Sequence, residues 1–154
     1  MVLEWLSGIK DITDIIASLS ELIKSNIATK DLLIKELKLN ITAFEIVQKD
    51  RKIDYDKLLL LLKNKQINKA RQSKFIFSII KKGKIENKHV KDIRNKKYIG
   101  KNCGWLFKNI DDKIDELRMT KQYHNTLTNM ERKVVALQFS NLFFKMKLLA
   151  EFIK

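Results

Sequence analysis

Apolar residues recur every three or four positions at the start of this chain, and no proline interrupts the sequence. From residue 2 to residue 23 the spacing alternates between three and four, which places the apolar side chains on one face of a helix. We call this face the interaction seam: Val2, Trp5, Ile9, Ile12, Ile16, Leu19 and Ile23. An apolar helix face must be buried against another surface, so the pattern predicts packing between helices.

The same rhythm returns near the other end of the chain, in Val135, Phe139, Leu142, Met146, Leu149 and Ile153. With 154 residues and only four glycines, the chain is long enough for one core and has little turn chemistry for a sheet. We therefore predict an all-α fold: one domain, residues 1–154, forming a bundle of four to five helices. A long basic connection should precede the fourth helix, which is expected at 103–119.

The expected helices cover about residues 2–24, a second stretch from 29, a third from Asp54 or Asp56, 103–119, and a last one from Thr128. The third stretch admits either one long helix with an exposed middle or two helices broken near Asn64, in both cases ended by Gly83. The second helix should lie at the centre of the bundle. The predicted core consists of Trp5, Ile9, Ile12, Ile16, Leu37, Phe44, Leu59, Ile110, Ile114, Phe139, Leu142 and Leu149.

Two polar or reactive residues within these helices have alternative interpretations. Asn40 interrupts the apolar face of the second helix, either to set the register between helices or to bind a neighbouring backbone. The single Cys103 excludes an internal disulfide and a cysteine-cluster zinc site, which suits a reducing cytoplasm, and we expect a buried thiol. We predict no metal and no cofactor.

Charged residues also bear on the location of the protein. Glu4, Lys10, Asp11 and Asp14 interrupt the first apolar stretch, which is unlike a signal peptide, and the most apolar window, 134–153, contains Lys145, Lys147 and Glu151. We therefore expect a cytoplasmic protein without a transmembrane helix, peripheral at most to the inner face of the membrane.

Positive charge is concentrated between residues 81 and 101, which we call the basic segment. Its nine basic residues face two acidic ones, Glu86 and Asp92, so it carries +7 of the chain's net +14. Such a positive field attracts phosphate on nucleic acid or on anionic lipid. The predicted anion-binding residues are Lys81, Lys82, Lys84, Lys88, Lys91, Arg94, Lys96, Lys97 and Lys101. Tyr98 and Trp105 flank them and could stack on bases.

A second hypothesis concerns Arg118 and His124. Their Arg-x5-His spacing resembles the signature of HEPN ribonucleases, although Met119 stands where that family usually has a polar residue. The resemblance implies that Arg118 steadies a phosphate and that His124 assists attack by the ribose 2′-hydroxyl, without a metal. RNA cleavage does require a cation at the phosphate and a group that titrates near neutrality.

The order of helices carries a further resemblance. The Leu-rich stretch around Leu33, Leu37 and Phe44, followed later by Trp105-Leu106-Phe107, is similar to small bacterial helical-bundle proteins of unassigned role and to the HeLo and mixed-lineage-kinase-like four-helix bundles. This resemblance implies an antiviral defence effector or adaptor that acts at a membrane.

We therefore favour a non-catalytic interaction module that engages an anionic membrane surface or nucleic acid through the basic segment. One alternative is the HEPN-like ribonuclease. The other is an adaptor that docks on a protein partner, or on a second copy of the chain, through the interaction seam.

Overall fold

The computed structural model describes residues 12–23, 27–50 and 52–154, and over these residues the fold is all-α, as predicted. Within them there are six α-helices and several short 3₁₀ turns, so the predicted count of four to five helices does not match. The helices are α1 (Ile12–Leu22), α2 (Ala28–Val47), α3 (Tyr55–Leu61), α4 (Lys65–Gln72), α5 (Cys103–His124) and α6 (Arg132–Ile153). Val2, Trp5 and Ile9 of the interaction seam lie outside the described residues.

The extra helix arises because the third predicted stretch is two helices, α3 and α4, separated by residues 62–64. Asn40 of α2 holds the break: its amide donates to the carbonyl of Lys63 and its Oδ1 accepts from the Lys63 N–H, both at 2.7 Å. Binding of Asn40 to a neighbouring backbone, the second of its two interpretations, is therefore confirmed.

The end of α4 also differs from the prediction, because Gly83 does not terminate this helix. The chain leaves α4 through Lys74, whose φ of 57° is left-handed, and Phe75 N–H returns to the Ala70 carbonyl at 2.9 Å. This pattern is a helix-ending Schellman motif with lysine where glycine is usual. Phe75 and Phe77 consequently belong to a connection that contains the 3₁₀ turn η2 (Phe77–Ile79), and the basic connection precedes α5 rather than a fourth helix.

The last two helices also begin and end at other residues than expected. Helix α5 continues to His124, and Asn125 follows with a φ of 67°. The predicted start at Thr128 is wrong, since α6 begins at Arg132 after the turn η5 (Leu127–Asn129). Asp56 binds the Leu127 N–H at 2.9 Å and the Thr126 hydroxyl, and these bonds outweigh burial to lower the pKa of Asp56.

Helix α6 is the most buried of the described helices, whereas α2, which was expected at the centre, contacts α1, α3, α4 and α6 but keeps one side exposed. Residues 142–146 are all buried, and five consecutive helical residues point in every direction around the axis. Helices α1, α2 and α5 pack against α6, as do the turns η3 (Asn87–His89) and η4 (Ile93–Tyr98). Helix α2 instead exposes Leu32, Leu39 and Ile46 by 42–53%. Most of the predicted core is confirmed, with Ile16 only half-buried and Trp5 and Ile9 outside the described residues.

A buried polar network fixes α4 between α2 and α5. Glu36 of α2 accepts from the backbone N–H groups of Gln66 and Ile67 at 2.8 and 3.2 Å, and burial raises the pKa of Glu36 against the effect of these bonds. On the other side, Asn64 donates to Asp111 at 2.7 Å, and Arg71 bonds to the same carboxylate at 2.8 Å. The polar groups therefore specify where the chain turns between α3 and α4.

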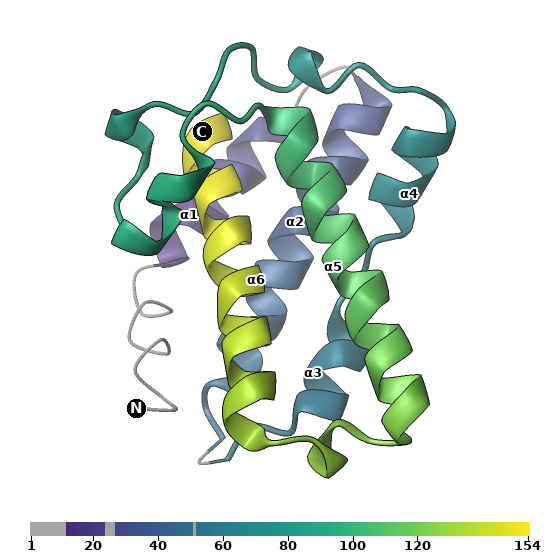
Figure 1. The fold of residues 1–154 in the computed structure, drawn as a ribbon. Helices are drawn as coiled ribbons and strands as arrows, with labels where there is room; N and C mark the ends of the chain where they lie inside the picture. Colours follow the sequence, from purple (N-terminus) through teal and green to yellow (C-terminus); the bar gives the residue numbers. More distant parts are fainter. Residues whose placement is uncertain (1–11, 24–26, 51) are drawn as a thin grey trace.

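The connection between α4 and α5 passes over the end of the bundle where α5 begins and α6 ends (Figure 1). It therefore brings the basic segment to the C-terminal half of α6. In the part of the chain that is described, no helix combines the length and the apolar character needed to cross a membrane.

We expect Asp111→Ala to lower the free energy of unfolding by about 2–3 kcal/mol, because it removes charged hydrogen bonds to Asn64 and Arg71 from a buried position. Asp112→Ala is the matched control: Asp112 binds the same Arg71 nitrogen at 2.6 Å, but its side chain is 67% exposed, so the loss should stay below about 1 kcal/mol. Urea denaturation followed by circular dichroism measures both. Equal losses would show that the network does not depend on burial.

Candidate anion-binding surface

The basic segment is a closed loop rather than an open connection. Ile85 N–H donates to the Lys101 carbonyl at 2.8 Å, and Gly100 N–H donates to the Ile85 carbonyl at 2.9 Å. Lys84 and Asn102 form an antiparallel bridge beside these bonds. Gly83 and Gly100 have φ angles of 85° and 91°, a region that suits glycine. Compact loops with joined ends of this kind are frequently functional.

Contacts with α6 hold the body of this loop. Asn95 is buried and donates to the Phe144 carbonyl at 3.3 Å. Arg94 donates to the Ser140 hydroxyl at 3.2 Å and lies over the Phe144 ring. The imidazole of His89 packs edge-on against Phe152 at 4.9 Å. These contacts with α6 therefore order the loop, and His89 contributes to them by packing on Phe152.

The basic side chains of the loop differ in how far they are engaged. Lys88, Lys91 and Arg94 form ion pairs with Glu86, Glu151 and Asp92, at 3.5, 3.1 and 3.9 Å. Lys81, Lys97 and Lys101 lie over aromatic rings of Phe152, Tyr98 and Trp105. Lys82, Lys84 and Lys96 are exposed, and none of the described residues forms an ion pair or a ring contact with them. The segment therefore keeps a net positive surface.

Lys145 of α6 adds a buried cation beneath this surface. It is 7% exposed, bonds to Asn109 of α5 and lies 5.7 Å from the centre of the Tyr98 ring. Burial, reinforced by the positive charges of Lys113 and Lys97, lowers the pKa of Lys145 to about 8, while Glu116 acts in the opposite direction. The sequence analysis did not predict a role for Lys145, because a lysine within an apolar stretch indicates an exposed position rather than a buried cation.

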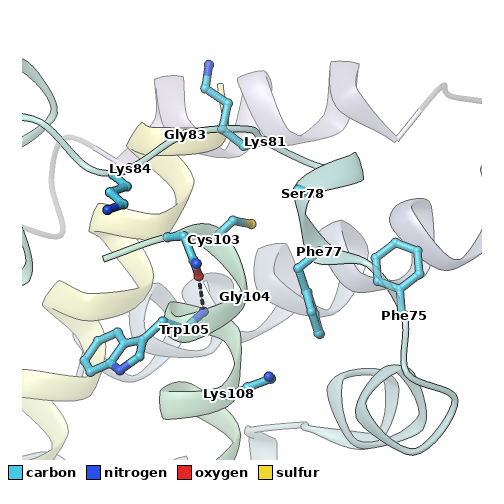
Figure 2. Close-up of a pocket in the computed structure, with 11 residues that line it drawn as sticks. Phe75, Phe77, Ser78, Lys81, Gly83, Lys84, Cys103, Gly104, Trp105 and Lys108 are labelled. Atoms are coloured by element: carbon cyan, nitrogen blue, oxygen red, sulfur yellow. Dashed lines mark hydrogen bonds between the residues drawn. The ribbon is translucent and has the colours of Figure 1, made fainter. Parts of the chain in front are cut away.

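A pocket of about 650 Å³ opens at the edge of the loop where α5 begins (Figure 2). Three lysines line this basic pocket, Lys81 and Lys84 from the loop and Lys108 from α5. Three aromatic residues complete its walls: Phe75, Phe77 and Trp105. The residues that line it include no Asp or Glu. The volume lies within the range of about 300–1,000 Å³ that is typical of small-ligand sites.

The first turn of α5 forms one wall of the basic pocket. Asn102 caps the helix by accepting from the Trp105 N–H at 2.8 Å (Figure 2). Gly104 follows, and a Cβ added there would lie 3.2 Å from the Cβ of Phe77, so the glycine lets Phe77 pack against the helix. Lys108 is four residues further on and therefore lies on the same helix face as Gly104. Sequence reasoning missed Lys108 and Phe77 because this wall depends on how α5 meets η2.

Cys103 is buried, as predicted, although it lines the same pocket. Burial raises the pKa of the Cys103 thiol to about 12, so the sulfur is protonated at neutral pH. A protonated thiol is neither a good nucleophile nor a metal ligand. Cys103 therefore contributes packing rather than chemistry.

Arg118 and His124 both lie on α5, six residues apart, so their Cα atoms are about 120° apart around the helix axis. The guanidinium of Arg118 donates to Asn64 Oδ1 at 2.5 Å and to the Leu62 carbonyl at 3.0 Å. The His124 ring packs edge-on against Tyr123. Arg118 thus holds the α3–α4 break, and a ribonuclease role for the pair stays a prediction.

The described part of the interaction seam packs inside the protein. Ile12 and Leu19 are buried, while Ile16 and Ile23 are half-buried against the same core, where α1 contacts α2 and α6. Docking of another protein on these four residues would require α1 to leave the bundle.

The chain matches no family model, no curated protein and no solved structure. Among the described residues, no group of three or more His, Cys, Asp and Glu side chains is placed to hold a metal ion. The basic segment and the basic pocket are therefore the features of the described residues that bear on function.

We expect Lys145→Met to be more stable than the wild type near neutral pH, by up to about 3 kcal/mol, because a pKa lowered from 10.5 to about 8 reflects the cost of burying the charge. Between about pH 8 and pH 10 Lys145 is protonated in the unfolded chain but not in the folded protein, so the stability of the wild type rises with pH. The advantage of the variant should therefore shrink between about pH 8 and pH 10. Urea denaturation of both proteins over this pH range measures the difference in their free energies of unfolding. A difference that does not change with pH would contradict the prediction.

We expect Asn95→Ala to loosen the basic segment without unfolding the bundle, because Asn95 anchors the loop to the Phe144 carbonyl. Amides of residues 85–101 should exchange with deuterium about tenfold faster, while those of α2 stay protected. Hydrogen-exchange mass spectrometry measures this, with the exposed Lys96→Ala as control. Equal acceleration in α2 and in the loop would indicate a global effect instead.

Proposed function

We propose that this protein is a non-catalytic binding module for single-stranded nucleic acid, which it engages through the basic segment. The observation that carries the proposal is the loop's uncompensated charge: nine basic residues face Glu86 and Asp92 within the segment, on a loop that α6 holds in place. A fixed set of cations can bind successive phosphates without first ordering a disordered chain.

Two aromatic residues favour nucleic acid over a lipid surface. The rings of Tyr98 and Trp105 lie 5.6 Å apart and are half-buried, with Lys97 and Lys101 beside them. Stacking rings interleaved with cations are typical of surfaces that bind single strands. The 3₁₀ turns of the loop, by contrast, span only three to six residues, too short for the amphipathic helix that peripheral membrane binding commonly uses.

Lipid headgroups are the competing anionic partner, and the exposed Ile93 within the basic segment is the feature that favours them. The proposed cytoplasmic location suits either partner. The resemblance to HeLo-like bundles adds a proposed role in antiviral defence.

The proposal is tested by reversing four exposed charges that make few contacts within the protein: Lys82, Lys84, Lys96 and Lys97, each to Glu. Each reversal replaces a positive charge by a negative one and lowers the net charge by two, so the net charge falls from +14 to +6. Fluorescence anisotropy with a labelled single-stranded RNA should show an affinity at least about a hundredfold lower, and a weaker dependence on salt. Circular dichroism should stay unchanged.

The matched control reverses four exposed lysines elsewhere in the chain, at Lys35, Lys49, Lys57 and Lys133, and reaches the same net charge. It should lose less than about tenfold in affinity. Equal losses in the two variants would attribute binding to overall charge and contradict the proposal. Flotation with phosphatidylserine vesicles, in the absence of RNA binding, would favour the lipid partner instead.

A further inference from the structure

The basic pocket suggests a more specific ligand than a run of phosphates. We infer that it binds the terminal phosphate of a single-stranded nucleic acid, an inference that rests on the proposed function. The three lysines of the pocket come from two separate parts of the chain, the loop and the second turn of α5. They therefore lie at separate points around one concave site, with side chains that extend in different directions (Figure 2).

The charge of the pocket matches a phosphate monoester. A terminal phosphate carries about −1.5 to −2 at neutral pH, whereas a phosphodiester within a strand carries about −1. Lys81, Lys84 and Lys108 face no carboxylate among the residues that line the pocket. For Lys84 and Lys108, the described residues also supply no ion pair elsewhere, so both ammonium groups are available to a ligand.

The aromatic residues place the nucleotide that bears the phosphate. Phe75 and Phe77 lie on one side of the pocket, and Trp105 lies on the opposite side, from which Lys84 also approaches (Figure 2). A terminal base can therefore pack against apolar surface while its phosphate meets the lysines.

Trp105 also connects the pocket to the rest of the basic segment. Its ring pairs with Tyr98, and Lys97 lies 5.2 Å from the centre of the Tyr98 ring. A strand whose end occupies the pocket can thus continue over Trp105 and Tyr98 towards the other loop cations. In this arrangement the pocket holds the end of the strand, and the rest of the basic segment binds the nucleotides that follow.

The test compares three labelled RNA strands of one sequence, which carry a 5′-phosphate, a 3′-phosphate or no terminal phosphate. The unmodified protein should bind one of the two phosphorylated strands about tenfold more tightly than the strand without a terminal phosphate, because the added negative charge is attracted to the lysines of the pocket. A nucleoside monophosphate should compete for this extra affinity, which requires no variant and therefore no assumption about folding.

Variants locate the effect. Lys84→Ala combined with Lys108→Ala should abolish the preference for a terminal phosphate. Because Lys84 also belongs to the basic segment, this variant should weaken the unphosphorylated strand by about as much as the control pair described next. The control Lys88→Ala combined with Lys96→Ala removes two cations outside the pocket. It should weaken all three strands by a similar factor and preserve the preference.

The possible results distinguish a terminal-phosphate site from nucleic-acid binding in general. Binding of all three strands with equal affinity would overturn the terminal-phosphate site while leaving nucleic-acid binding intact. A preference that survives the loss of Lys84 and Lys108 would also overturn it. Failure to bind any strand would remove both the inference and the proposed function.

Discussion

An α-helix that is buried around its whole circumference at its middle imposes the main constraint on this fold. Helix α6 buries residues 142–146 without a gap, so every direction around its axis needs a cover. Helices α1, α2 and α5 supply most of it, and the turns η3 and η4 of the basic segment supply the remainder. A loop with a net charge of +7 is thus part of the packing of the most buried of the described helices.

This arrangement explains how many cations can be concentrated on one surface. Asn95 and His89 turn towards α6 and contact a backbone carbonyl and an aromatic ring, whereas the lysines beside them remain exposed. The inward-facing residues stabilise the loop, and the outward-facing residues are left to determine its charge. Repulsion among the lysines is offset by contacts with rings and by the ion pair between Lys91 and Glu151.

The all-α fold and most of the core follow from the apolar rhythm, because burial of a helix face depends on spacing that is local in sequence. The break between α3 and α4 could not be assigned, since it depends on Asn40, Asn64 and Arg118, which meet only in the folded chain. The left-handed Lys74 that ends α4 has no glycine to indicate it. The cations of the basic segment were visible as composition, but the basic pocket was not, because Lys108 joins it through the packing of Gly104 on Phe77.

The loop's dependence on α6 also affects the order in which the surface can form. Synthesis releases residues 81–101 well before 140–152, and domains gain structure as the chain emerges. Until Ser140, Phe144 and Phe152 are available, the lysines are present but the contacts that hold the loop against α6 are missing. A nascent chain therefore carries the positive charge of this surface before α6 has docked and given the surface its shape.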